Sequence, residues 1–136
     1  MSKSEPQPIA SRTVVPSNLI DAAGAAADKK AFDVVALDLR KANAFTDYFL
    51  ICSGQSARQV KTIADAIAEI MARRHAKPTH IEGHARAEWI LIDCFDFVVH
   101  VFTPDTRAFY ALERLWGSAE TVTLPIAEAD KPAPRP

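Results

Sequence analysis

Two apolar runs separated by only two residues constrain the fold of this chain more than any other feature. The runs cover residues 89–94 and 97–102, and nearly every position in both is hydrophobic. So short a connection makes an antiparallel hairpin the only easy geometry. Side chains alternate between the two faces of a sheet, so strands that are apolar throughout must be covered on both faces. The sequence therefore predicts a buried sheet whose cover comes from helices, with a partner protein able to supply the rest.

The rest of the chain supplies further strands and three helices. Residues 34–39 and 48–53 are apolar runs that predict a second antiparallel pair, and residues 79–82 predict a short strand. The resulting order α-β-β-α-β-β-β-α predicts a mixed α/β fold, with helices packed on a five-stranded sheet. The helices are expected at residues 17–30, 57–75 and 104–116.

A single domain is expected over residues 17–118. The flanking segments, 1–16 and 119–136, are rich in Pro, Ser, Ala and charged residues. Neither could bury enough apolar surface to offset the entropy of ordering, so we expect disordered tails. No stretch approaches the roughly 20 apolar residues that cross a bilayer, and the N-terminus lacks a signal-peptide pattern, so the expected location is the cytoplasm.

The charge of the chain bears on its partners. A formal net charge of −1 provides no field that would draw the protein onto nucleic acid, so contact with protein is expected rather than contact with RNA. Direct RNA binding stays as an alternative, through basic side chains that we otherwise expect to be solvated or paired within the protein. These side chains are Arg40, Lys41, Arg58, Lys61, Arg73 and Arg74.

Three carboxylates and one turn are the candidates for chemistry. Asp47, Asp93 and Asp96 lie near strand ends, where carboxylates more often cap turns than hold a metal. The turn at residues 53–56 could offer backbone N–H groups to a phosphate, but it also fits a plain strand-to-helix connection capped by Ser56. A nucleotide-handling enzyme built on this turn and Asp93 is therefore an alternative function.

The histidines and cysteines favour structural roles. His100 lies in the middle of a strand, where a hydrogen-bonded imidazole is expected, whereas the other histidines lie in polar, turn-like sequence and are expected to face solvent. The two cysteines lie inside apolar runs, where a thiol behaves as a small hydrophobe, and no disulfide is expected. The residues concerned are His75, His80 and His84, and Cys52 and Cys94.

Four segments resemble one protein family. The segments WILIDCFDFVVHVFTP (residues 89–104) and RAFYALERLW (residues 107–116) are similar to the signature of the ribosome silencing factors. Upstream, TDYFLICSG (residues 46–54) and RQVK (residues 58–61) fit the same family. The resemblance covers the chain from about Ser17 to Gly117.

The resemblance implies a fold and an absence of catalysis. Members of the family resemble nucleotidyltransferases in fold, but they are regarded as silencing factors without demonstrated transferase chemistry. A nucleotidyltransferase of that fold carries Gly-Ser before a helix and an Asp-x-Asp pair, whereas this chain has Ser53-Gly54 and places Asp93 and Asp96 three positions apart. We therefore expect no enzyme activity, no cofactor and no metal.

The resemblance also implies a partner. The family binds the large ribosomal subunit through its fourteenth protein, blocks joining of the small subunit and represses translation when nutrients are scarce; members resemble dimers in isolation. Residues Phe109, Leu112 and Trp116 suit core packing as well as an interface. Trp89, Leu91 and Asp93 alternate onto one strand face, and a charge there suggests incomplete burial. The residues expected to face the partner are Trp89, Leu91, Asp93, Tyr110, Glu113 and Trp116.

Overall fold

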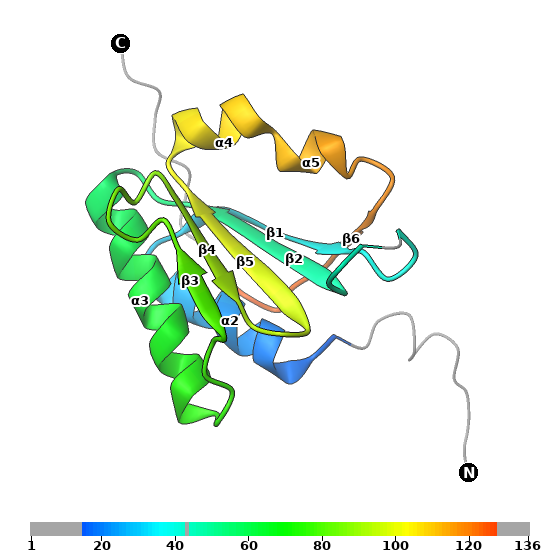
Figure 1. The fold of residues 1–136 in the computed structure, drawn as a ribbon, viewed down its shortest axis with the longest axis horizontal. Coiled ribbons are helices and arrows are strands. Elements are labelled where there is room, and N and C mark those ends of the chain that lie inside the picture. The colour runs from blue at the N-terminus through cyan, green and yellow to red at the C-terminus, as the bar shows by residue number, and fades with distance from the viewer. Residues whose placement is uncertain (1–14, 43, 128–136) are drawn as a thin grey trace.

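The fold consists of one mixed sheet with helices on both sides (Figure 1). A computed structural model describes residues 15–42 and 44–127. Helices α2 and α3 lie on one side of the sheet, and α4 and α5 lie on the other side. The elements are α2 (Ser17–Asp28), β1 (Phe32–Asp38), β2 (Tyr48–Ser53), α3 (Ala57–Arg73), β3 (His80–Glu82), β4 (Trp89–Asp93), β5 (Phe97–Phe102), α4 (Pro104–Tyr110), α5 (Leu112–Leu115) and β6 (Glu120–Val122).

The strand order across the sheet is β3-β4-β5-β2-β1-β6. The two antiparallel pairs predicted from the sequence, β1 with β2 and β4 with β5, are confirmed. The pairing of β2 with β5 in the centre is parallel, which makes the sheet mixed. Both edges of the sheet are strands of three residues, β3 and β6. In the part of the chain that the structure describes, no helix is long and apolar enough to cross a bilayer.

The sheet has six strands, so the expectation of five was wrong. The additional strand β6 pairs antiparallel with β1, with Val122 opposite Ala36. Three mostly exposed residues, Glu-Thr-Val, give no apolar pattern of their own, and only the pairing with β1 makes them a strand. The tail that we expected from residue 119 therefore begins with ordered chain, whereas residues 1–14 and 128–136 lie outside the described residues.

The side of the sheet beneath α2 and α3 holds the larger core. Helix α3 begins where the sequence predicts, because Ser56 Oγ accepts a hydrogen bond from the Gln59 N–H at 3.2 Å. The apolar stripe of α3 and the small residues of α2 pack together and against alternate strand positions. The largest fully buried side chains of this core include Leu19, Leu50, Ile63, Ile67, Met71, Ile90, Ile92 and Phe97.

The helix predicted over residues 104–116 is broken in the middle. Ala111 adopts the left-handed conformation, with φ 47° and ψ 54°, and separates α4 from α5. An alanine in this region is strained, so the surrounding contacts must hold it there. The break turns Leu112 onto the sheet, where it is buried, while Phe109 and Leu115 remain more than 70% exposed. A continuous helix would have placed these side chains differently.

Candidate partner-binding face

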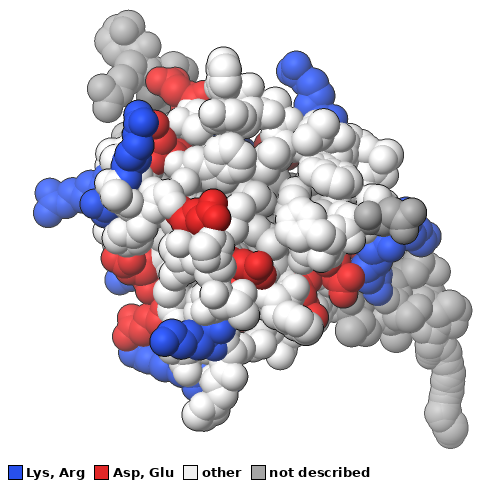
Figure 2. All heavy atoms as spheres, viewed as in Figure 1, with Lys and Arg blue, Asp and Glu red and all other residues white. Residues whose placement is uncertain are grey.

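The side of the sheet that α2 and α3 leave uncovered carries a second, smaller core. Leu37, Phe49, Ile51, Val98 and Phe102 face this side and are at most 4% exposed, with Leu112 of α5 packed among them. We call this side of the sheet, together with α4 and α5, the open face. In the view of Figure 2, uncharged side chains form a continuous surface that contains a few acidic groups, and Lys and Arg side chains project mainly from its margins.

Strand β4 contributes the residues of the open face that the sequence singled out. Ile90 and Ile92 are fully buried on the helix side, whereas Trp89, Leu91 and Asp93 are half-buried on the open face. The alternation inferred from the sequence is therefore present. Asp93 Oδ1 accepts a hydrogen bond from the Phe95 N–H at 3.0 Å, so this carboxylate caps the hairpin turn, as expected for a strand-end aspartate.

The Trp89 indole lies at the centre of an aromatic cluster. Its ring centroid is 4.7 Å from that of Tyr110 on α4, 5.0 Å from Phe102 and 5.9 Å from His100. Tyr110 is 50% exposed. The structure therefore brings together two of the predicted interface residues, Trp89 and Tyr110, from elements that are separate in the sequence. Half-exposed Trp and Tyr side chains held in a cluster are typical anchors of protein interfaces.

His100 lies beneath this cluster and is only 3% exposed. Its Nδ1 atom accepts a hydrogen bond from the Trp89 indole N–H at 3.0 Å, which confirms the hydrogen-bonded imidazole expected in mid-strand. Burial lowers the pKa of His100 from 6.5 to about 4, so the ring is neutral at physiological pH. With Nδ1 as acceptor, the proton belongs on Nε2, which finds no hydrogen-bond partner among the described residues.

The structure assigns different surroundings to the other two predicted residues. Trp116 is half-buried, and its ring meets that of Phe49 edge-on at 5.9 Å. Glu113 accepts two hydrogen bonds from Arg107 inside the protein. Neither side chain belongs to the cluster of Trp89 and Tyr110. Sequence reasoning missed three strongly exposed hydrophobic side chains, Phe45, Phe95 and Leu115. It left Phe109 open between core packing and an interface, and the structure leaves this side chain 79% exposed.

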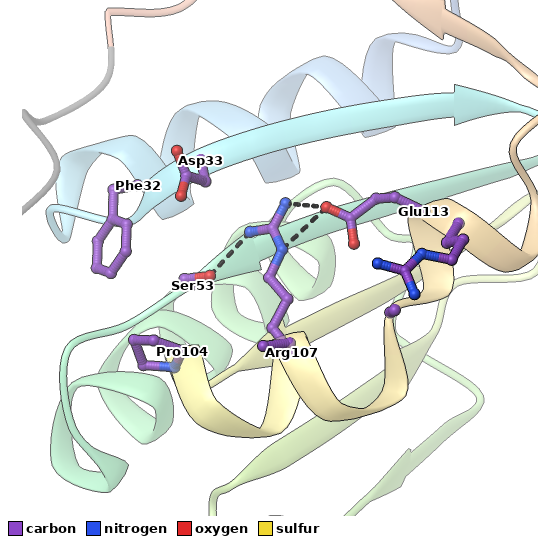
Figure 3. A pocket seen from close by; sticks show the side chains of 9 residues that line it. Phe32, Asp33, Ser53, Pro104, Arg107 and Glu113 are labelled. Carbon is purple, nitrogen blue, oxygen red and sulfur yellow. Dashed lines mark hydrogen bonds and ion pairs between the residues drawn. The ribbon is translucent and has the colours of Figure 1, made fainter.

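A cavity of about 410 Å³ opens beside the open face, where β2 ends and α4 passes over it (Figure 3). Arg107 crosses it with a side chain that is 11% exposed. Its Nε and one terminal nitrogen donate to Glu113 Oε2 at 3.0 and 2.6 Å, and the other terminal nitrogen donates to Ser53 Oγ at 2.8 Å. Arg107 thus ties both sides of the break at Ala111 to the end of β2.

Substituting Arg107 tests this bracing role. The variant Arg107→Met is expected to lower the free energy of unfolding by about 1–3 kcal/mol, because Glu113 and the buried Ser53 lose their charged donor. Urea denaturation measures the change. Arg73→Met is the matched control, since the pair of Arg73 with Glu69 is mostly exposed and is expected to contribute less than about 1 kcal/mol. Equal losses in the two variants would contradict the bracing role.

The structure does not bring together the two parts of the nucleotide site considered from the sequence. Ser53 pairs with Phe102 at one end of β5, whereas Asp93 pairs with Val98 near the other end, so the sheet register holds them apart. Two backbone N–H groups of the turn already donate hydrogen bonds within the protein. The Gly54 N–H donates to the Phe102 carbonyl oxygen, and the Gln55 N–H donates to the Gln59 side-chain oxygen. Among residues 15–42 and 44–127, no three His, Cys, Asp or Glu side chains are grouped as a metal site.

Several basic side chains, both cysteines and three histidines were weighed from the sequence, and the structure shows their surroundings. Three of the basic residues weighed for RNA binding form ion pairs within the protein: Arg40 with Asp38, Arg73 with Glu69, and Arg74 with Asp21. The expectations for the thiols and the remaining histidines are confirmed. Neither cysteine forms a disulfide, burial raises the pKa of the Cys94 thiol to about 12, and three histidines are exposed, namely His75, His80 and His84.

Comparison with known proteins reveals relatives over most of the chain. The model of the family described as "Ribosomal silencing factor during starvation" matches residues 13–136. Proteins named ribosomal silencing factor RsfS are 46% identical in Halalkalibacterium halodurans, over 76% of this chain and 88% of the relative, and 43% identical in Bacillus subtilis, over 80% and 88%. A mouse protein named "Mitochondrial assembly of ribosomal large subunit protein 1" is 29% identical, over 65% of this chain and 40% of its own length.

Solved structures agree with this relationship. A crystal structure from Bacillus halodurans superimposes with a TM-score of 0.72 at 43% identity, covering 81% of this chain and all of the other. One from Chromobacterium violaceum gives 0.74 at 30% identity, covering 88% and 91%. The match of the family model and the identities over most of both chains establish family membership. The chain belongs to the ribosomal silencing factor (RsfS) family.

Proposed function

We propose that this protein binds the large ribosomal subunit through the fourteenth protein of that subunit and blocks joining of the small subunit, so that translation falls when nutrients are limiting. Membership of the silencing factor family supports a regulatory role on the ribosome. The name of the mouse relative, which refers to the large ribosomal subunit, supports the choice of subunit. The observation that carries the proposal is the half-exposed cluster of Trp89 and Tyr110 on the open face.

The open face suits docking because its centre is apolar and its surroundings are polar. Trp89 and Leu91 remain half-buried, and Tyr110 and Phe109 are exposed beside them, with ring centroids 5.0 Å apart. Interfaces of this kind gain most of their affinity from a few large aromatic anchors, while polar rim groups such as Asp93 add specificity. Steric exclusion of the small subunit then needs only a bound protein of this size. The proposal therefore assigns no catalysis and no cofactor to the chain.

The same face also suits self-association. Phe109 and Tyr110 of α4 and Leu115 of α5 are exposed large hydrophobic side chains on this face, and such surface is costly to leave in water when the ribosomal partner is absent. We propose that the free protein pairs through the open face as a homodimer in the cytoplasm. Because both contacts would use the same face, they exclude each other, and the dimer must dissociate before either copy binds the ribosome.

Sedimentation of mixed ribosomal subunits tests the proposed function. Purified large and small subunits are combined with magnesium, with and without a molar excess of the protein, and separated on a sucrose gradient. Pre-incubation of the large subunit with the protein is expected to shift material from joined ribosomes to separate subunits, with the protein in the large-subunit fractions. Pre-incubation of the small subunit alone, followed by washing, is the control. Joining at the same level in both samples would overturn the proposal.

A further inference from the structure

We propose that His100 is a positioning residue for docking, because its Nδ1 atom holds the Trp89 indole in the orientation that a protein partner binds. This inference rests on the proposed function and adds to it a residue that the partner need not touch. His100 is 3% exposed, whereas Trp89 above it is half-buried and reaches the surface. His100 therefore acts through Trp89 rather than by direct contact.

Three contacts restrict the indole, and only one of them is directional. The rings of Tyr110 and Phe102 lie 4.7 and 5.0 Å from it, at interplanar angles of 47° and 31°. Ring packing of this kind leaves room for rotation about the side-chain bonds. The hydrogen bond from Trp89 Nε1 to His100 Nδ1, at 3.0 Å, requires a single orientation. An anchor that is ordered before binding loses less entropy when the partner arrives.

The choice of histidine at this buried position is otherwise costly. The surrounding side chains on the open face are apolar or aromatic, and the Phe49 ring meets the imidazole edge-on at 4.5 Å. The proton on Nε2 has no acceptor among the described residues, so a polar group is buried without compensation. A leucine would fill a similar space without that cost. What leucine lacks is an acceptor for the indole, which is the contribution that we assign to His100.

The neutral state of the imidazole keeps this acceptor available. A protonated ring would carry hydrogens on both nitrogens and could no longer accept from the indole. The groups that face His100 are Phe49 and Ile51 from β2, Trp89 and Leu91 from β4 and Phe102 from its own strand, and none of these carries a charge. Burial among them lowers the pKa of His100 to about 4, which leaves Nδ1 unprotonated at physiological pH.

Two substitutions separate the acceptor from the bulk of the ring. The variant His100→Leu removes the acceptor and is expected to weaken binding to purified large subunits roughly 5-fold to 10-fold, the equivalent of one hydrogen bond. Its unfolding midpoint is expected to equal or exceed that of the unaltered protein, because the unpartnered N–H is removed. The variant His100→Asn places an amide oxygen near the position of Nδ1 and is expected to restore most of the affinity.

A double-mutant cycle with Trp89→Phe gives the decisive measurement. Phenylalanine has no N–H, so His100→Leu is expected to have no further effect on affinity in the Trp89→Phe background. In the free protein, the Trp89 indole N–H resonance is expected to exchange with water faster in His100→Leu than in the unaltered chain and in His100→Asn. The Trp116 indole resonance of the same sample is the internal control.

The outcomes distinguish this inference from the proposed function. If His100→Leu weakens binding equally in both backgrounds, or leaves binding and indole exchange unchanged, the positioning role is wrong while ribosome binding stands. If the unaltered chain does not bind large subunits, the proposed function fails and the docking role of His100 fails with it. An effect confined to the Trp89 background, rescued by asparagine, supports the inference.

Discussion

Replacing Trp89 by glutamate is expected to weaken binding to the large ribosomal subunit by at least about 30-fold, because central aromatic anchors contribute 2 kcal/mol or more. The substitution removes the ring that packs on Tyr110 and Phe102 and the N–H that bonds to His100. It also places a carboxylate in the apolar part of the open face. A docked partner would remove the water that solvates this carboxylate, which costs binding free energy. Cosedimentation with purified large subunits, at a series of protein concentrations, measures the loss.

The matched control for this substitution is Ile81→Glu. Ile81 is 41% exposed on β3 and pairs with Ile92, so it lies on the helix side of the same sheet. The control makes the same change of charge away from the open face and is expected to bind normally. Circular dichroism and thermal melting check that both variants fold. A folded Trp89→Glu variant that binds as tightly as Ile81→Glu would show that the open face is not the docking surface.

Lowering the pH from 7 to 4 is expected to reduce the free energy of unfolding by roughly 3 kcal/mol through His100 alone. The pKa of His100 is about 4 in the folded protein and about 6.5 once unfolding exposes the ring to water. Above pH 6.5 both states are neutral, and the full stability is present. Between pH 6.5 and 4 the unfolded state takes up a proton that the folded state excludes, so stability falls as the pH falls.

Urea denaturation at several pH values checks this prediction. The variant His100→Leu cannot take up the proton and is expected to show a markedly flatter profile between pH 6.5 and 4. Asp38 does not change the profile between pH 6.5 and 4. The hydrogen bonds from Arg40 hold the pKa of the Asp38 carboxyl below 3.8, so its contribution to the free energy of unfolding is lost only at lower pH. Parallel profiles for the two proteins through this window would contradict a neutral, buried His100.

Local patterns in the sequence were sufficient to predict much of the fold. The apolar runs around residues 48–53, 89–94 and 97–102 predicted strands that are confirmed. Strands β2 and β5 are buried on both faces, so the apolar signal covers every position, whereas β4 is fully buried on one face and half-buried on the other. Strand β6 left no such signal, since its three residues depend on pairing with β1. The break at Ala111 was also missed, because neither glycine nor proline marks it and the contacts that stabilise it come from elsewhere in the chain.

The candidate site was predicted less completely than the fold. Alternation along β4 was enough to group Trp89 with Leu91 and Asp93. The bond between Trp89 and His100 joins side chains of neighbouring strands, in a register that places Leu91 opposite His100, and the apolar pattern does not show which side-chain atoms meet. The hydrogen bonds of Arg107 with Glu113 form across the helix break, which the sequence did not predict. The hydrogen bond of Arg107 with Ser53 joins residues 54 positions apart. Contacts of this kind arise only in the folded chain.

The shortness of the two edge strands has a consequence for evolution and for engineering. Strands β3 and β6 offer only three residues each, so another chain could gain few backbone hydrogen bonds by extending the sheet at either side. Backbone pairing is nearly blind to sequence, whereas docking on side chains depends on their identity. A protein that recognises its partner through side chains can change its affinity by single substitutions. Its short edge strands also keep copies of it from polymerising edge to edge.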